Sequence, residues 1–352
     1  MIRSGLLLLF VLLVFGCEQD QHADNIADEV SIFFKDNHLD KRTSYLDVWH
    51  QNDSIIGKTT SESLAERFTT FVEDRHLSKH VSIDVITPTK AFVRNSVSNS
   101  RSVPKHSGEL STQYLMGQAV SILKEDGDWY YIQGPDDYLS WIDGGGIIME
   151  EEASEEWLNA KKQTVQINEY SANTAGGQAS IASDLVFGNI LGKLDENTYV
   201  TPSGTRLNIT NPVVFEEKPG DAIENVITRA YSLMGRPYLW GGTSTKGIDC
   251  SGFTRTAFMN AGYMLGRDAS LQVKEGEAVD EKDISAWQRG DLLFFGTVRD
   301  DGSHRITHVG IHTENGDMIH ASERVRVESV NPESSIYNEE RANTLLEVRR
   351  IL

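Results

Sequence analysis

The stretch Ile248-Asp249-Cys250-Ser251-Gly252-Phe253 decides the fold of the C-terminal part of the chain. A loop with two adjacent glycines precedes it, and apolar residues recur after it at helical spacing as far as Gly262. The pattern predicts a helix that begins at Cys250 and ends near a glycine cap. Backbone N–H groups at a helix N-terminus favour a thiolate, so Cys250 is a candidate nucleophile. On this stretch alone, a small buried structural cysteine is the alternative.

The size and charge of the chain limit what it can be. A chain of 352 residues is too long for one compact core, so we expect about two to four domains. Lysine and arginine number 33 against 52 aspartates and glutamates, which gives a net charge of −19. Because no basic surplus exists to neutralise phosphates, nucleic acid and anionic lipid are excluded as general partners.

The N-terminus predicts export. Residues 1–17 hold one early arginine, an apolar run too short to span a bilayer, and then Gly16-Cys17, which together are typical of a signal peptide. The ending Val14-Phe15-Gly16-Cys17 resembles the lipobox of bacterial lipoproteins. The resemblance implies that Cys17 is lipidated and tethers the chain to a membrane in the cell envelope, facing the periplasm or on the cell surface. An ordinary cleaved signal is the alternative. With Cys17 lipidated, Cys250 has no disulfide partner.

The pattern of apolar and turn residues divides residues 18–352 into four parts. Residues 18–85 carry two helical patterns and predict a short helical N-terminal region. Residues 86–150 and 151–217 are short strand-like runs separated by turns, as in small β-barrels. Residues 218–352 begin with helical patterns and continue as strands, which predicts an α+β domain.

A thiol nucleophile needs a base and a group that orients the base, and two histidines are candidates. In the predicted strand 306–312, His308 and Gly310 lie on one face and the apolar residues on the other. A two-residue turn after this strand places His320 on the face away from His308. A three-residue loop with Gly316 in a left-handed bulge pairs Gly310 with His320 and puts both histidines on one face. The sequence permits both registers.

Other histidines of this region do not predict a metal site. His308 and His312 share a strand face, but residues four apart on a strand are separated by roughly 13 Å, too far to hold one ion. We therefore expect no metal and no cofactor, and we expect His304 and His312 to be solvated or edge residues.

Two groups of motifs resemble known families. The stretches 99–104, 127–130 and 138–142, with Gly117 between them, are similar to a bacterial SH3-like barrel, although Ser140 stands where that family usually has glycine. A second SH3-like barrel is expected over 151–217. The C-terminal part resembles the NlpC family of papain-like cell-wall peptidases. The motifs are Tyr238-Leu239-Trp240-Gly241-Gly242, Asp249-Cys250-Ser251-Gly252, Gly290-Asp291-Leu292, His308-Val309-Gly310-Ile311 and His320-Ala321.

The resemblance implies a fold and residue roles. The fold class is α+β, with a papain-like C-terminal catalytic domain preceded by two small SH3-like β-barrels and a short helical N-terminal region. Cys250 would be the nucleophile of a thioester mechanism, His308 the general base and His320 the residue that orients it. The backbone N–H of Cys250 and the hydroxyl of Tyr238 would stabilise the oxyanion. Two further residues, Asp249 and Ser251, would line the substrate groove.

A narrower resemblance, to γ-D-glutamyl-L-diamino-acid endopeptidases of the dipeptidyl-peptidase VI type, implies a substrate. Such an enzyme hydrolyses the γ-D-glutamyl–diamino acid bond of peptidoglycan stem peptides or muropeptides. Asp268, in the run 267–272, would hold the free amine of an N-terminal L-alanine, and Tyr138 of the first barrel would close that end of the groove. A helix N-cap and a surface turn residue are the respective alternatives. We expect a monomer. The competing functions are a papain-like amidase or acyltransferase, and a non-catalytic wall-binding lipoprotein.

Overall fold

The structure is a computed structural model that describes residues 18–174, 184–215 and 221–352. The predicted signal peptide, with Cys17, lies outside the described residues. Among the described helices, none has the length and apolar character needed to cross a membrane. The chain divides into two compact units, residues 1–87 and 88–352, and each is described by itself.

The first unit contains two helices and a three-stranded sheet. Its elements are α1 (Glu18–Asp36), β1 (Leu46–Gln51), β2 (Ser54–Thr59), α2 (Glu62–Asp74) and β3 (His80–Val85). β1 pairs antiparallel with β2, which pairs parallel with β3 across the α2 connection. Phe33 of α1 and Phe68 of α2 stack edge to face, with ring centroids 5.0 Å apart, over Ile55 of the sheet. The sequence patterns indicated the helices but missed β1 and β2.

The first barrel occupies the start of the second unit. Its strands are β4 (Thr89–Val93), β5 (Val97–Arg101), β6 (Leu110–Leu115), β7 (Ala119–Asp126), β8 (Trp129–Gln133), β9 (Leu139–Asp143) and β10 (Ile147–Met149). They form one sheet in the order β10-β4-β7-β8-β9-β5-β6 around an apolar core. Ser140 pairs with Ile132 inside the regular β8–β9 ladder, so the departure from glycine does not disturb a turn. Its hydroxyl lies 3.3 Å from that of Tyr114.

A second β-rich region follows. It consists of α3 (Glu155–Asn159), β11 (Lys161–Thr164), β12 (Glu169–Ser171), β13 (Asn173–Thr174), β14 (Asp184–Val186), β15 (Ile190–Lys193), β16 (Thr198–Val200) and β17 (Arg206–Asn208). Five strands form a sheet in the order β11-β15-β16-β17-β13, and β12 pairs with β14. The region joins the first barrel directly, because Ile190 N–H donates to the Met116 carbonyl at 2.8 Å and Met116 enters its core.

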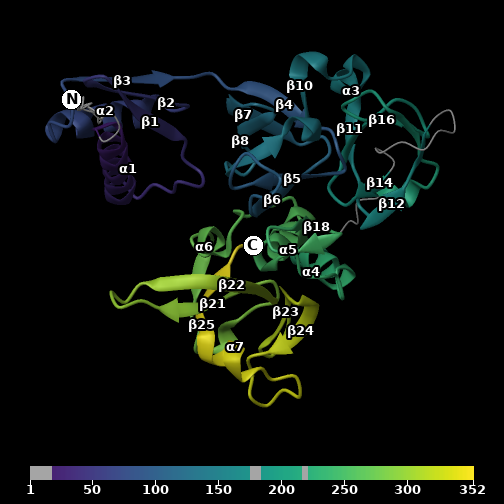
Figure 1. Cartoon of the computed structure of the whole chain (residues 1–352). Helices are drawn as coiled ribbons and strands as arrows, with labels where there is room; N and C mark the ends of the chain where they lie inside the picture. Colours follow the sequence, from purple (N-terminus) through teal and green to yellow (C-terminus); the bar gives the residue numbers. More distant parts are fainter. Residues whose placement is uncertain (1–17, 175–183, 216–220) are drawn as a thin grey trace, which may run out of the picture. The chain divides into compact units, whose positions relative to one another are not determined.

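The C-terminal region is an antiparallel sheet covered by helices (Figure 1). Its elements are α4 (Ala222–Ser232), β18 (Thr243–Ser244), β19 (Gly247–Ile248), α5 (Cys250–Met259), α6 (Ala269–Gln272), β20 (Glu277–Val279), β21 (Leu292–Val298), β22 (His304–His312), β23 (Asp317–Ser322), β24 (Arg324–Ser329), α7 (Glu339–Thr344) and β25 (Leu345–Arg350). The main sheet has the order β20-β25-β21-β22-β23-β24. α5 packs on β22 and β23 through Phe253 and Phe258, which gives the predicted α+β arrangement.

Polar contacts join the first barrel to this α+β region. Thr243, before α5, hydrogen-bonds through its hydroxyl to the Gln113 carbonyl at 2.7 Å and through its N–H to the Gln113 side chain at 3.1 Å. Arg255 of α5 lies 3.1 Å from Asp136 of the barrel, with side chains 7% and 2% exposed. Because both charges are buried, each depends on the other for compensation.

Asp136→Asn should destabilise the second unit markedly. The substitution removes the carboxylate and leaves the buried Arg255 guanidinium without its counter-charge, which typically costs about 3–5 kcal/mol. Urea unfolding followed by tryptophan fluorescence measures the change. The control is Glu150→Gln, which breaks the exposed Lys90–Glu150 pair and should change stability by less than about 1 kcal/mol. Equal stability of the two variants would contradict the importance of the Arg255–Asp136 pair.

Candidate active site

Cys250 is the first residue of α5, where the sequence predicted it. Asp249 caps this helix, accepting a hydrogen bond from the Gly252 N–H at 2.7 Å. The helix start rests directly on the preceding glycine loop, because a Cβ at Gly252 would lie 2.2 Å from the Gly242 carbonyl oxygen. Any larger side chain at this position would push α5, and the thiol with it, away from the loop.

His308 and His320 are brought together by the bulged register. Residues 314–316 form a three-residue loop closed by a hydrogen bond from Thr313 N–H to the Asp317 carbonyl, and Gly316 has a φ of +83°. The ladder pairs Ile311 with Ile319, and its continuation sets Gly310 opposite His320. His308 Nε2 then lies 2.7 Å from His320 Nδ1, with the rings nearly perpendicular. Of the two registers that the sequence permitted, the structure therefore has the one that pairs the histidines.

Burial disfavours the charged forms of both the thiol and the imidazole. Burial, followed by the negative charge of Asp249, raises the pKa of Cys250 to about 12, although the Val309 backbone N–H and Arg267 act in the opposite direction. Burial also lowers the pKa of His308 well below its ordinary value. Burial therefore opposes the thiolate that the helix N-terminus was predicted to favour.

Asp249 and Ser251 are held by a buried arginine. Arg267, 1% exposed, donates from Nη2 to Asp249 Oδ2 at 2.6 Å and from Nη1 to Oδ1 at 3.2 Å. The same Nη1 lies 3.1 Å from Ser251 Oγ, and the Gly241 N–H donates to Asp249 at 3.0 Å. These contacts join the glycine loop, the helix start and the 267–272 run. The groove-lining role assigned to Asp249 and Ser251 stays a prediction, and sequence reasoning overlooked Arg267.

Tyr238 lies at the edge of the same site. Its backbone N–H donates to the Glu323 carbonyl at 2.9 Å, which fixes the loop to the start of β24. Burial and then the nearby Cys250 and Asp249 raise the pKa of the Tyr238 hydroxyl. The hydroxyl therefore remains a hydrogen-bond donor at neutral pH, as an oxyanion contact requires.

Asp268 and Tyr138 meet across the boundary between the barrel and the α+β region. The Tyr138 hydroxyl donates to Asp268 Oδ2 at 3.2 Å. Tyr138 is only 8% exposed, so it is not a surface residue of a turn. Asp268 precedes α6, but its side chain makes no capping hydrogen bond to that helix. The structure thus brings together two residues that lie 130 positions apart in the sequence.

Two other histidines differ in their surroundings. His304 is exposed and its Nδ1 lies 2.9 Å from Glu347. His312 is buried, which contradicts the prediction of a solvated or edge position. Its Nδ1 lies 2.9 Å from the Gln288 carbonyl, and its Nε2 accepts from the Gly316 N–H at 3.3 Å. His312 therefore supports the loop that sets the register of His308 and His320.

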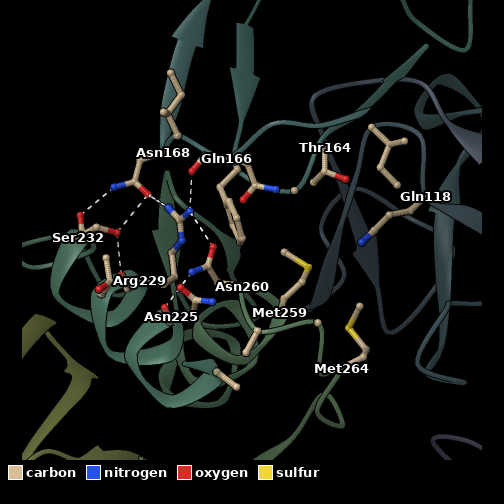
Figure 2. Close-up of a pocket in the computed structure, with 18 of the residues that line it drawn as sticks. Gln118, Thr164, Gln166, Asn168, Asn225, Arg229, Ser232, Met259, Asn260 and Met264 are labelled. Carbon is tan, nitrogen blue, oxygen red and sulfur yellow. Dashed lines mark hydrogen bonds between the residues drawn. The ribbon is translucent and has the colours of Figure 1, made fainter. Parts of the chain in front are cut away.

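A cavity of about 960 Å³ lies apart from these residues, lined by the first barrel, the second β-rich region and α4–α5 (Figure 2). Its one charged lining residue among the described residues is Arg229, whose guanidinium lies over the Phe187 ring at 3.6 Å. Arg229 donates to the Asn168 side chain at 2.7 Å, to the Gln166 carbonyl at 2.5 Å and to the Asn260 side chain at 3.2 Å. These bonds hold α4 and α5 against the second β-rich region.

A buried thiol at the start of a helix that packs on a strand with a paired histidine is the arrangement expected of a papain-like cysteine peptidase. Family models agree with this class: residues 235–348 match the NlpC/P60 family and residues 101–146 match the bacterial dipeptidyl-peptidase Sh3 domain. The chain belongs to the NlpC/P60 family of cysteine peptidases.

Individual relatives resemble the chain over most of their length. The chain is 31% identical over 246 residues to the gamma-D-glutamyl-L-lysine dipeptidyl-peptidase of Bacillus subtilis, covering 66% of this chain and 79% of the relative. It is 28% identical over 278 residues to dipeptidyl-peptidase 6 of Lysinibacillus sphaericus, covering 72% and 97%. The crystal structure of an NlpC/P60 family protein from Bacillus cereus superposes with a TM-score of 0.61 at 24% identity, covering 75% of this chain and all of that chain, which shows the shared fold.

The raised pKa of Cys250 predicts a steep pH dependence of alkylation. With Cys17→Ser, Cys250 is the only cysteine left in the chain. Its reaction with iodoacetamide should accelerate about tenfold per pH unit between about pH 6 and pH 9, because the thiolate fraction grows throughout this range. N-acetylcysteine serves as the control, since its rate levels off above its pKa of about 8.5. A plateau for the protein below pH 7 would instead indicate a resting thiolate–imidazolium pair.

Proposed function

We propose that the chain is a peptidoglycan endopeptidase that hydrolyses the γ-D-glutamyl–diamino acid bond of stem peptides or muropeptides with a free N-terminal L-alanine. The contact between Tyr138 and Asp268 is the observation that carries the finer part of the proposal. It supplies a carboxylate and a hydroxyl at one end of the site. The names of the relatives from Bacillus and Lysinibacillus support the same substrate class.

In the proposed reaction Cys250 is the nucleophile. The thiol transfers its proton to His308 while the sulfur attacks the carbonyl carbon of the γ-glutamyl bond. The Cys250 N–H and the Tyr238 hydroxyl stabilise the negatively charged oxygen of the tetrahedral intermediate. The C–N bond then breaks, and the leaving amine of the diamino acid takes the proton from His308. Water, activated by His308, hydrolyses the resulting thioester and regenerates the thiol.

The free amine is the proposed basis of substrate selection. Asp268 offers a carboxylate to the ammonium group of L-alanine, and the Tyr138 hydroxyl holds this carboxylate in place. Because Tyr138 comes from the barrel, the barrel forms a wall at this end of the site. A stem peptide still joined to glycan has no ammonium group there and is longer, so it would be excluded.

Two other functions use the same residues differently. An acyltransferase would pass the thioester to an amine instead of water, and a wall-binding lipoprotein would not use the thiol at all. The buried histidine pair, 2.7 Å apart, favours a catalytic role for the site over pure binding. Turnover of the tripeptide L-Ala-γ-D-Glu-diaminopimelate in water separates all three, and Cys250→Ala provides the blank.

The free-amine proposal predicts selectivity that depends on Asp268. The wild type should cleave L-Ala-γ-D-Glu-diaminopimelate more than about tenfold faster than its N-acetylated form, because the blocked amine leaves a carboxylate unpaired. Asp268→Asn should lose about tenfold on the free substrate and little on the blocked one, so that the selectivity falls. Steady-state kcat/KM on both substrates is the measurement.

Tyr131→Phe is the matched control for Tyr138→Phe, since Tyr131 belongs to the same barrel but packs on Trp141. Tyr138→Phe should lower kcat/KM on the free substrate several-fold, whereas the control should leave it unchanged. Equal wild-type rates on free and blocked substrates would show that the amine is not recognised. The enzyme would then be a general stem-peptide hydrolase.

Lipidation of Cys17 remains part of the proposal, and with it the location in the cell envelope and the membrane tether. The motif Val14-Phe15-Gly16-Cys17 supports it. Cys17→Ser should abolish palmitate incorporation and cause the unprocessed precursor to accumulate, because the thiol is the site of acylation. Labelling with radioactive palmitate, followed by membrane sedimentation, tests this. Equal labelling of both proteins would refute the anchor.

A further inference from the structure

A third ionisable side chain, that of Glu328, lies next to the His308–His320 pair. Glu328 of β24 lies next to His320 across the β23–β24 ladder, diagonal to the pair that His320 forms with Arg326. Its Oε2 atom is 3.0 Å from His320 Nε2, while His320 Nδ1 is 2.7 Å from His308 Nε2. The His320 side chain is fully buried and that of Glu328 is 13% exposed. Three groups therefore form a continuous buried row that ends at a carboxylate.

The carboxylate is ionised and firmly held. Arg326 Nη2 lies 2.6 Å from its Oε1, and the Asn338 side-chain amide donates to Oε2 at 3.0 Å. Arg341 Nε lies 4.0 Å from Glu328 Oε2. The contact with His320, followed by the nearby positive charges, lowers the pKa of Glu328 to about 2. An ionised carboxylate can only accept hydrogen bonds.

The ionised state of Glu328 determines where the imidazole protons lie. His320 Nε2 lies beside the negative charge of Glu328, which favours the hydrogen on this nitrogen in the neutral ring and leaves Nδ1 as the acceptor. The hydrogen in the 2.7 Å contact must then belong to His308 Nε2. Neutral His308 consequently has its lone pair on Nδ1, the nitrogen that is not engaged by His320. A base for the Cys250 thiol requires such a free lone pair on one ring nitrogen.

We propose that Glu328 is a positioning residue that fixes the tautomers of His320 and His308 and compensates the positive charge formed on His308 when it takes the thiol proton. The proposal rests on the proposed function. It also explains why a carboxylate lies in this place: Arg326 and Arg341 both act against a positively charged His308, and Glu328 opposes them.

The contact between Glu328 Oε2 and His320 Nε2 does not have the straight geometry of a good hydrogen bond. Oε2 lies within hydrogen-bonding distance of Nε2, but away from the direction in which the ring N–H bond points. The carboxylate therefore acts mainly through its charge, which makes removal of the charge the informative substitution. A purely structural role, in which Glu328 only neutralises the two arginines, would lower stability without changing the tautomers of the histidines.

The closing experiment reads the tautomers directly. Two-bond ¹⁵N–¹H correlation spectra of the substrate-free full chain with ¹⁵N-histidine report which nitrogen of each ring carries hydrogen, and His308→Asn and His320→Asn assign the signals. We expect Nε2–H in both rings of the wild type. Nδ1–H in His320 of the wild type would overturn the proposal. This measurement needs neither enzyme activity nor a folded Glu328 variant. Its result can therefore be distinguished from a failure of the proposed function.

Glu328→Gln adds a kinetic test, with Glu347→Gln as the matched control, because Glu347 forms the exposed pair with His304. Loss of the carboxylate should lower kcat/KM about tenfold or more. It should also move the acid limb of the kcat/KM–pH profile to lower pH. Without the carboxylate, the positive charges of Arg326 and Arg341 lower the pKa of His308 and His320 unopposed. The ionisable groups on the other side of the site, Asp249 and Cys250, are unchanged. The control should change neither quantity. An unshifted acid limb in Glu328→Gln would contradict the proposed role.

Discussion

The active site depends on the buried ion pair between Asp249 and Arg267. The guanidinium binds both carboxylate oxygens, at 2.6 and 3.2 Å, and the same carboxylate caps α5 and holds the Gly241 loop. Breaking a buried pair by removing one partner typically costs about 3–5 kcal/mol. Cys250 follows Asp249 in the chain and Asp268 follows Arg267, so one interaction fixes both the proposed nucleophile and the proposed amine-binding carboxylate.

Much of this arrangement could be predicted from sequence. The glycine loop before Cys250 and the apolar spacing after it gave the start of α5 correctly, because both are local features of the sequence. The pairing of His308 with His320 was one of two possible registers, and the sequence could not choose because both loop lengths suit Asn315-Gly316. The family resemblance alone suggested that Asp268 and Tyr138 lie at the same end of the groove, and their direct contact was not predicted.

Other features depend on distant contacts that no local pattern reveals. Arg267 is a charged residue beside another charged residue, which ordinarily indicates solvent exposure, yet it is 1% exposed. The role of Glu328 requires the β23–β24 register and the positions of two arginines. The high pKa of Cys250 results from burial by segments far along the chain. β1 and β2 were missed because few of their residues are both apolar and buried, so the apolar pattern is weak.

The Tyr138–Asp268 contact also has a consequence for how such enzymes diversify. The proposed catalytic groups all come from residues 238–328, whereas the proposed wall beside Asp268 comes from a barrel more than a hundred residues earlier in the chain. The proposed catalytic groups and the proposed wall therefore lie in different segments of one chain, and Asp268 of the catalytic segment contacts the wall. Under the proposed function, exchanging the barrel for one that keeps the buried partner of Arg255 would change which molecules enter while leaving the proposed catalytic residues in place.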